Sequence, residues 1–253
     1  GAVTLQPRGH LGTFLISKKL DLLWQVSGIG ALSCGMPLPH TGSLEGLASA
    51  ILASFDKHGI PLNISYVRGS RRRIDELLSG TVHFVVMSKL AAEAAKGGGE
   101  AIEVAMEFGP HSFVNEHAII FSQQRDTEIR DGMKLGVEPW SIDQTVIAPL
   151  ICEGKRVEII EIEYIRLPDL PALLESGRVD AVIWNFDKIR QEPSEIHTEP
   201  LPPNVQAQLA GQNTIACLVA HSENAFVASL LRQVVDRDEV LAIQRDILAG
   251  RRV

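Results

Sequence analysis

LLSGTVHFVV, at residues 77–86, is the stretch from which the fold of this chain can be predicted. Its leucines end a helical pattern, a glycine stops the helix, and an apolar run of strand length follows. A similar stretch, LLESGRVDAV, stands at residues 173–182 with the same order of helix end, glycine and strand. The recurrence predicts two similarly built α/β halves. The alternative is that both stretches only show what any turn from a helix to a parallel strand looks like.

The segments around each copy alternate in the same way between strand and helix. Between the apolar run at residues 31–36 and the next strand, Leu44, Leu47, Ile51 and Phe55 recur at helical spacing. This alternation predicts an α/β fold with mainly parallel strands. Strands are expected at residues 31–36, 62–67, 81–87, 101–106, 118–121, 134–137, 157–165, 179–184 and 214–219, and a last helix at residues 238–248.

Polar and proline-rich stretches predict the boundaries between the halves. Residues 122–132 are polar, and residues 192–203 are rich in proline and acidic side chains. We therefore expect the chain to leave the first lobe near Ser122 and to return near Pro200, which makes a hinge of two crossovers. In this division residues 1–28 form an N-terminal arm, residues 29–122 and 203–253 form lobe 1, and residues 123–202 form lobe 2.

The order of elements resembles the type II fold of periplasmic binding proteins. In that fold two α/β lobes are joined by a double crossover hinge, and it also serves as the effector domain of LysR-type regulators. The resemblance covers residues 29–250, and its most specific parts are the two related stretches and KLGV at residues 134–137. It implies that a ligand binds in the cleft between the lobes.

The N-terminal arm narrows the choice of family. RGHLGTFL, at residues 8–15, is similar to the wing of GntR-type winged-helix domains, in which a glycine-rich turn precedes Gly-Thr-Phe. A wing without preceding helices implies a DNA-binding domain that is absent from this sequence. The whole chain thus resembles the C-terminal region of the YhfZ family, whose members are expected to be regulators. A plain edge strand is the structural alternative for the arm.

The composition argues against several functions. A formal charge of −7 argues against nucleic-acid binding by these residues alone, because phosphate binding needs a positively charged surface. The apolar runs are too short to span a bilayer, and the first residues do not read as a secretory signal. Cys34, Cys152 and Cys217 form no CxxC pair and are expected to be reduced thiols. We therefore expect a cytoplasmic protein with no membrane partner.

Candidate ligand-binding residues follow the strands. In open α/β sheets, ligands bind beyond the carboxyl ends of the strands, where helix N-termini present free N–H groups. This rule selects loops at residues 39–43, 68–71, 88–89 and 138–143, together with the residues after the strand at 179–184. The predicted contacts are His40, Thr41, Ser43, Arg68, Ser70, Arg71, Ser88, Trp140, Ser141, Asp143, Asn185 and Asp187.

Each of these residue types also has a structural interpretation. The hydroxyls in the first two loops either bond an anion or cap their own helices. The arginines at 68 and 71–73 suit a carboxylate or phosphate, or form a solvated basic turn. The tryptophan either stacks on a ligand or fills the core, and the last two residues either contact a ligand or form an Asx turn. The arginines favour an anionic small molecule as the effector.

Sequence signatures of enzymes are missing: G-x-S-x-G, H-E-x-x-H, G-x-x-x-x-G-K-[ST], and G-x-G-x-x-G after a strand. The histidines are scattered, and His111 with His117 lacks a third ligand at metal-site spacing. We expect no catalytic residue, metal or cofactor. The predicted function is the small-molecule-sensing effector domain of a bacterial transcription regulator, a homodimer that contacts DNA only through the absent domain. The alternatives are a solute-binding protein of a transporter and an enzyme on this scaffold.

Overall fold

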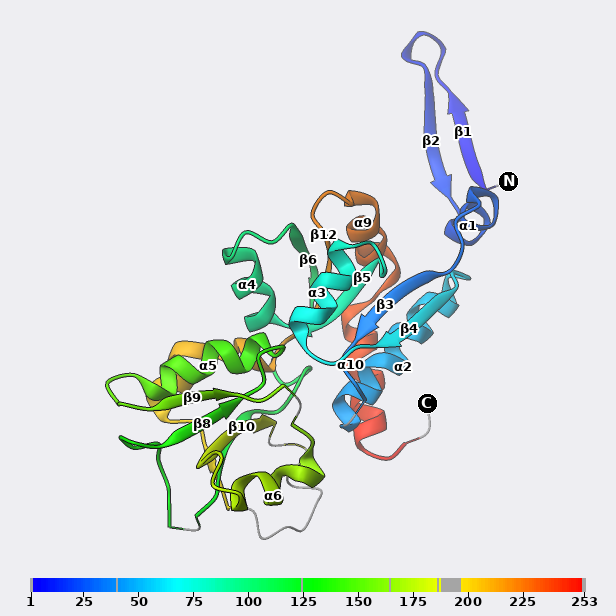
Figure 1. Cartoon of the computed structure of the whole chain (residues 1–253). Helices are drawn as coiled ribbons and strands as arrows, with labels where there is room; N and C mark the ends of the chain where they lie inside the picture. The colour runs from blue at the N-terminus through cyan, green and yellow to red at the C-terminus, as the bar shows by residue number, and fades with distance from the viewer. Residues whose placement is uncertain are drawn as a thin grey trace.

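The structure, a computed structural model, describes residues 2–39, 41–123, 125–163, 165–185, 187 and 197–251. Two α/β lobes lie side by side, and a hairpin stands away from one of them (Figure 1). Each lobe is built on a five-stranded sheet, and the hairpin is a separate two-stranded sheet. In these ranges no helix combines the length and the apolar character needed to cross a membrane.

Lobe 1 has a mixed sheet with the strand order β4-β3-β5-β12-β6. β3 runs parallel to β4 and β5, whereas β12, the strand added from the C-terminal end of the chain, runs antiparallel to β5 and β6. Its elements are β3 (Leu32–Met36), α2 (Gly42–Lys57), β4 (Leu62–Tyr66), α3 (Ser70–Leu78), β5 (Phe84–Ser88), α4 (Lys89–Gly97), β6 (Ile102–Glu107), β12 (Ala216–His221), α9 (Ala225–Val234) and α10 (Arg237–Leu248).

The central strand β5 is buried on both faces. Phe84 and Val86 pack into the core that α2, α9 and α10 cover, whereas Val85 and Met87 pack into the core beneath α3 and α4. Successive side chains of a strand point to opposite faces, so a strand between two layers of helices must be apolar at every position. This explains the unbroken apolar run in the stretch that predicts the fold.

Lobe 2 repeats this architecture with the strand order β11-β7-β10-β8-β9. β8 runs parallel to β9 and β10, and β7 runs antiparallel to β10 and β11. Its elements are β7 (His117–Phe121), β8 (Lys134–Val137), α5 (Ile142–Cys152), β9 (Glu158–Glu161), the 3-10 turn η2 (Leu167–Asp169), α6 (Leu170–Glu175), β10 (Ala181–Asn185), β11 (His197–Pro200) and α8 (Pro203–Leu209). The 3-10 turn η3 (Gln212–Thr214) follows in the segment that returns to lobe 1.

The predicted boundaries between the lobes are wrong, although the double crossover itself is present. The chain enters lobe 2 through residues 108–116 rather than near Ser122, because β7 pairs with β10 and β11. It returns through residues 210–215 rather than near Pro200, because Val205 and Leu209 of α8 pack in the lobe 2 core. An apolar run such as β7 predicts a buried strand but does not indicate which sheet it joins. β11 falls in the stretch predicted to be only a connection.

The two lobes pack against each other through α4 of lobe 1 and α5 of lobe 2. Leu90 of α4 belongs to the lobe 2 core, where it packs with residues such as Leu135. In the opposite direction, Ile142 of α5 belongs to a lobe 1 core that contains Met87 and Ala91. Each lobe therefore contributes an apolar side chain to the other, and burial of these side chains holds the two lobes together.

The N-terminal arm consists of β1 (Val3–Pro7), the 3-10 turn η1 (Gly9–Leu11), β2 (Thr13–Lys18) and α1 (Leu20–Ser27). The hairpin pairs with neither lobe, and every residue of β1 and β2 is exposed. Its base is fixed to lobe 1, because Trp24 of α1 is buried in the lobe 1 core and Lys18 Nζ donates to Gln233 Oε1 of α9 at 2.6 Å. The arm is thus a projecting hairpin rather than an edge strand of either main sheet.

Candidate functional site

A cleft of about 350 Å³ lies between the two lobes, and both contribute to its walls. Lobe 1 supplies the loop after β3 and the start of α3, and lobe 2 supplies the start of α5, the residues before η2 and the end of β10. Residues of the first crossover and the start of β7 form the base. The cleft thus lies beyond the carboxyl ends of parallel strands, as the general rule for open α/β sheets predicts.

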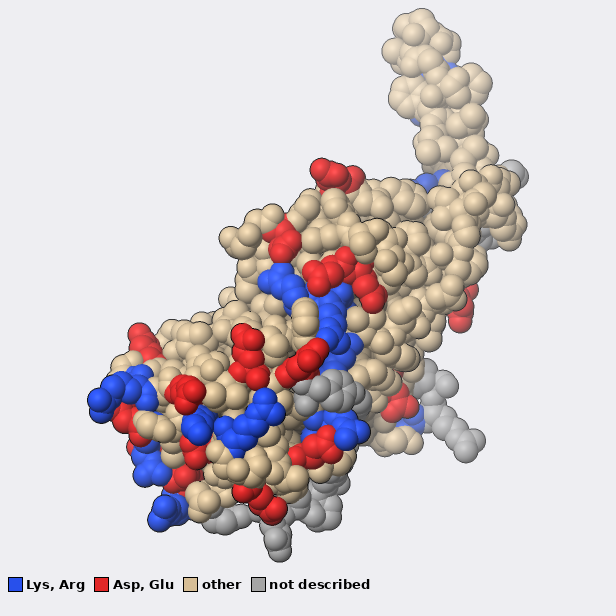
Figure 2. Space-filling model, viewed as in Figure 1, with Lys and Arg blue, Asp and Glu red and all other residues tan. Residues whose placement is uncertain are grey.

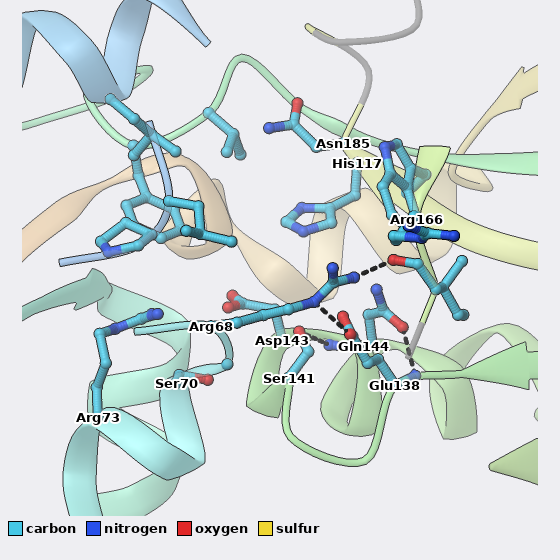
Figure 3. A pocket seen from close by; sticks show the side chains of 18 of the residues that line it. Arg68, Ser70, Arg73, His117, Glu138, Ser141, Asp143, Gln144, Arg166 and Asn185 are labelled. Atoms are coloured by element: carbon cyan, nitrogen blue, oxygen red, sulfur yellow. Dashed lines mark hydrogen bonds and ion pairs between the residues drawn. The ribbon is translucent and has the colours of Figure 1, made fainter. Parts of the chain in front are cut away.

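The structure brings several of the predicted contacts together in this cleft. Its walls include Arg68 and Ser70 from lobe 1, and Ser141, Asp143 and Asn185 from lobe 2. In Figure 3 these side chains surround a common space, with Arg68 reaching across it from lobe 1. The loop-based prediction therefore selected residues that share one site although they are far apart in the sequence.

Arg68 joins the lobes directly. Its Nε donates to Glu138 Oε1 of lobe 2 at 2.6 Å, and its guanidinium also donates to the carbonyl oxygen of Ile165 (Figure 3). Both partners of the ion pair are largely buried, so the pair is screened little by solvent. The guanidinium predicted to bind an anion is thus engaged by a carboxylate of the protein.

The start of α3 contacts the start of α5 across the cleft. Ser70 Oγ accepts a hydrogen bond from the backbone N–H of Ile142 at 2.9 Å, and the backbone N–H of Arg71 donates to the carbonyl oxygen of Trp140 at 3.1 Å. Ser70 therefore caps the N-terminus of a helix in the opposite lobe and makes no capping bond to its own helix. The hydroxyl, which was expected either to cap its own helix or to bond an anion, stabilises the contact between the lobes instead.

Trp140 lies at the same contact and does not face the cleft. The guanidinium of Arg72 stacks over its ring with 4.3 Å to the centroid, and its backbone lies against Gly69 of lobe 1. The indole Nε1 is buried and has no hydrogen-bond partner among the described residues. The tryptophan thus packs between the lobes, which corresponds to its structural interpretation.

Other predicted residues of lobe 1 bond to other parts of the protein. Thr41 Oγ1 caps α2 by accepting from the N–H of Leu44 at 3.3 Å, and Ser43 is buried with its carbonyl oxygen bonded to Gln244. Arg71 forms an ion pair with Glu100 at 2.6 Å. None of these side chains lines the described cleft. His40 lies outside the described residues.

Asp187, the last predicted contact, also has an internal partner. Its carboxylate accepts hydrogen bonds from the backbone N–H and the side-chain amide of Asn115, in the first crossover. The backbone N–H of Asp187 in turn bonds Asn185 Oδ1 at 2.9 Å, which is the predicted Asx-type turn. Asp187 therefore ties the end of β10 to the hinge, whereas Asn185 lies at the wall of the cleft.

Some of the side chains that line the cleft are buried and ionisable. Asp143 Oδ1 accepts a hydrogen bond from Ser88 Oγ of lobe 1 at 2.6 Å, and Ser88 also caps α4. Arg73, on α3, is 3% exposed and donates through Nη1 to the carbonyl oxygen of Val67 at 2.8 Å. Its Nε has no hydrogen-bond partner in the described part of the chain. An unpartnered guanidinium N–H in a buried site is costly, and Arg73 is also one of the residues that line the cleft, so its guanidinium is a candidate ligand contact.

Burial shifts the ionisation of these groups. It lowers the pKa of Arg73 to about 10, an effect that the nearby Asp143 carboxylate opposes. Burial also raises the pKa of Asp143 and lowers the pKa of His117, because a charge is less stable away from water. The attraction of Asp143 for Arg73 and for a protonated His117 opposes all three of these pKa shifts. The site therefore keeps opposite charges close together in a poorly solvated space.

Sequence reasoning missed part of the wall. Glu138 belongs to a selected loop but was not chosen, and Arg73 was considered with its neighbouring arginines as suited to an anion but was not chosen as a contact. His117 was rejected as a metal ligand and interpreted as a surface or core histidine, yet it lines the cleft at 8% exposure. Within the described residues, no cluster of three or more His, Cys, Asp or Glu side chains is arranged to hold a metal ion. The signal that could have found Arg73 is its helical spacing, since it lies three residues after Ser70 on the same face of α3.

Charged side chains gather on one part of the visible surface. Figure 2 shows lysine, arginine, aspartate and glutamate over lobe 2 and around its junction with lobe 1, whereas the projecting hairpin is almost free of them. Positive and negative groups alternate near the junction rather than forming a field of one sign. This face of the lobes therefore offers no continuous basic surface for a nucleic acid.

Comparisons with known proteins agree on one family. The family model described as the YhfZ C-terminal domain matches residues 20–253. The YhfZ protein of Escherichia coli strain K12 is 32% identical over 253 residues, which cover 99% of this chain and 79% of that protein. The crystal structure of YhfZ from Shigella flexneri is 31% identical, with a TM-score of 0.71 over 91% of this chain and 95% of that chain.

More distant similarity shows the fold. The substrate-binding protein of an amino acid ABC transporter superposes with a TM-score of 0.60 at 14% identity, covering 87% of this chain and 98% of that chain. The predicted α/β architecture, with two lobes like those of type II periplasmic binding proteins, is thereby confirmed. With the family model matching nearly the whole chain and the relatives above 30% identity, the chain belongs to the YhfZ C-terminal domain family.

Proposed function

We propose that this chain is the small-molecule-sensing domain of a transcription regulator and that its ligand binds in the cleft between the lobes. The observation that carries the proposal is Arg73, which is buried at the cleft with an Nε–H that has no partner among the described residues. The binding-protein fold supports the same conclusion. A ligand that bonds Arg73 and touches both lobes stabilises the closed state more than the open state, which is what coupling requires.

The lining of the cleft defines the chemistry of the ligand. An anionic group matches the guanidinium of Arg73, and Asp143 offers a carboxylate to a donor of the same ligand. Leu38, Phe113 and Trp184 supply apolar walls. We therefore expect a small polar molecule with a negatively charged group and an apolar part, of a size that fits a cleft of about 350 Å³.

The projecting hairpin favours a regulator. Its two strands and glycine-containing turn have the form of a winged-helix wing, and both faces are exposed. The family model begins at residue 20, after the hairpin, and the Escherichia coli relative extends beyond the matched 79% of its length. We propose that a winged-helix domain precedes the wing, contacts DNA and is paired in a homodimer in the cytoplasm. The ligand-binding lobes themselves then need no basic surface.

The proposal is tested with the full-length natural protein and its own promoter DNA. Addition of the ligand should change the affinity for DNA in a mobility-shift assay. Arg68→Gln should weaken this response, because it removes the ion pair with Glu138 across the cleft. Arg156→Gln is the matched control, since Arg156 is an exposed arginine of lobe 2 away from the cleft. An unchanged response in Arg68→Gln would show that the site is assigned wrongly.

A solute-binding protein of a transporter is the second candidate function. The observation in its favour is the fold, which this chain shares with the substrate-binding protein of an amino acid ABC transporter. The two functions require different compartments, so cell fractionation of the natural protein separates them. We propose no enzymatic role for this domain.

A further inference from the structure

His117 lies where the cleft meets the hinge. It is the first residue of β7, directly after the first crossover, and its ring lines the cleft between the lobes. The same residue also lines a smaller cavity of about 200 Å³ together with Gly211, Asn213 and Thr214 of the second crossover. One imidazole therefore touches both the space for a ligand and the segments that connect the lobes.

The hinge side of the ring determines its tautomer. Nδ1 of His117 lies 3.0 Å from Nδ2 of Asn213, in the second crossover. An amide nitrogen can only donate, so Nδ1 must be the acceptor, and a neutral ring then carries its proton on Nε2. Burial lowers the pKa of His117, and the charges of Asp143 on α5 and of Asp187 after β10 only partly oppose this. The ring is therefore neutral near pH 7.

The other side of the ring faces the cleft. Figure 3 shows the imidazole of His117 pointing into the space between Asn185 and Arg68. Within the described part of the chain, the hydrogen bond to Asn213 is the only one that the ring forms. The Nε2–H group is thus a donor on the cleft wall that is available to a ligand.

We propose that His117 transmits ligand binding to the hinge, with Nε2–H donating to an oxygen acceptor of the ligand while Nδ1 holds Asn213. The proposal rests on the proposed function of the cleft. The proton stays on Nε2 throughout. An acceptor bound at Nε2 polarises the ring, which makes Nδ1 a stronger acceptor for Asn213. An occupied cleft therefore tightens the contact between the two crossovers and favours one hinge geometry.

The tautomer is measured directly on the unaltered chain. Long-range proton–nitrogen correlation spectra of 15N-labelled protein distinguish the two nitrogens of each histidine ring, and the spectrum of His117→Gln assigns the signals. We expect His117 to be neutral at pH 7 with its proton on Nε2. A proton on Nδ1 would overturn the proposal, because the hinge contact could not then be an Nδ1 acceptor.

Two variants separate the cleft contact from the hinge contact. In His117→Gln the longer amide reaches the position of Nε2 and keeps a donor in the cleft, but it loses the Nδ1 acceptor. In His117→Asn the shorter amide keeps an acceptor near Asn213 and loses the donor. The probes are hexanoate, hexanamide and hexylamine, which share an apolar chain and differ in whether they present an oxygen acceptor. Binding is followed by the change in tryptophan fluorescence, since Trp184 lines the cleft, and by the side-chain amide signals of Asn213.

Hexanoate or hexanamide should bind the natural chain and His117→Gln, and should bind His117→Asn about tenfold more weakly, the effect of one lost hydrogen bond. The affinity for hexylamine should not depend on which residue stands at position 117. The Asn213 signals should move on binding in the natural chain but not in His117→Gln. Equal movement in both, or equal binding by His117→Asn, would overturn the role of His117 alone. If none of the three probes changes the tryptophan fluorescence, the result contradicts both the ligand-binding function of the cleft and the role of His117.

Discussion

Gly69 has a backbone that only glycine adopts readily, with φ of +82°, and it lies directly against the opposite lobe. A Cβ atom placed there would lie 2.7 Å from both the Cβ and the carbonyl oxygen of Trp140. Trp140 belongs to lobe 2, so the missing side chain at residue 69 is what lets the starts of α3 and α5 approach. The hydrogen bond between Ser70 and Ile142 depends on this approach.

Gly69→Ala should therefore open the cleft as well as strain the backbone. Gly80→Ala is the matched control, because Gly80 has φ of +76° with no atom within 4 Å of its added Cβ. Both variants should lose about 1–2 kcal/mol from the positive φ. Only Gly69→Ala should increase the radius of gyration measured by small-angle X-ray scattering. Identical scattering from the two variants would contradict the assigned contact.

The lowered pKa of His117 predicts a pH-dependent stability. The unfolded chain takes up a proton on this ring near pH 6.5, whereas the folded chain takes it up only at lower pH. The unfolding free energy should therefore decrease as the pH falls below about 6.5. Urea unfolding between pH 7.5 and 5.5 should show a steeper loss for the natural chain than for His117→Gln. Parallel curves would mean that the ring is not buried in its neutral form.

For single residues, the sequence predicted where polar side chains gather but not which groups they bond. Ser70 was expected to cap α3 or to bind an anion, whereas its partner is Ile142, 72 residues away. Such a contact exists only once the lobes close, so no local pattern indicates it. His117 had no local signal either, because an isolated histidine before an apolar strand reads the same whether it faces a core or a cleft.

Among the elements, α4 and α5 decide how firmly the lobes are joined. Leu90 is 8% exposed and packs in the core of lobe 2, although α4 belongs to lobe 1. Leu90→Ala should lower the free energy of unfolding by about 2–5 kcal/mol, as for other buried leucines. It should also let the lobes unfold separately, seen by hydrogen-exchange mass spectrometry as unequal protection of β5 and β8.

Leu47→Ala is the control for this prediction. Leu47 is fully buried within lobe 1, so its loss should be of similar size. It creates a cavity away from α5 and should leave the two lobes equally coupled. If both variants uncouple the lobes to the same extent, the packing of α4 against α5 is not what joins them.

The elements themselves were largely predictable, because the strands of each lobe are short apolar runs between helical patterns. What could not be predicted was the sheet that each strand joins. β7 follows β6 in the sequence, but the segment between them crosses to lobe 2, and only pairing with β10 and β11 shows this. β11 was missed because His197, Thr198, Glu199 and Pro200 lack an apolar run. It forms a strand because its backbone pairs with β7, and its position at the edge of the sheet tolerates a proline.

For the whole molecule, the two crossovers and the cleft form one unit. Arg68 with Glu138, and Ser88 with Asp143, join the lobes across the cleft, while His117 with Asn213 joins the crossovers at its base. The closed arrangement thus has contacts of its own beside those that a ligand adds. A ligand then needs to supply only the additional preference that shifts the population between states. In the proposed regulator, the projecting hairpin, which is fixed to lobe 1 through Trp24, is the part that carries such a shift outward.

The most direct test of the central claim is a thermal-shift screen of small metabolites against the natural chain, Arg73→Lys and the exposed control Arg156→Lys. At least one compound with an anionic group should raise the melting temperature of the natural chain and the control by about 5–10 °C at a hundredfold excess over its dissociation constant. The same compound should have little effect on Arg73→Lys. Compounds that stabilise all three proteins equally, or the absence of any stabilising compound, would contradict a ligand site between the lobes at Arg73.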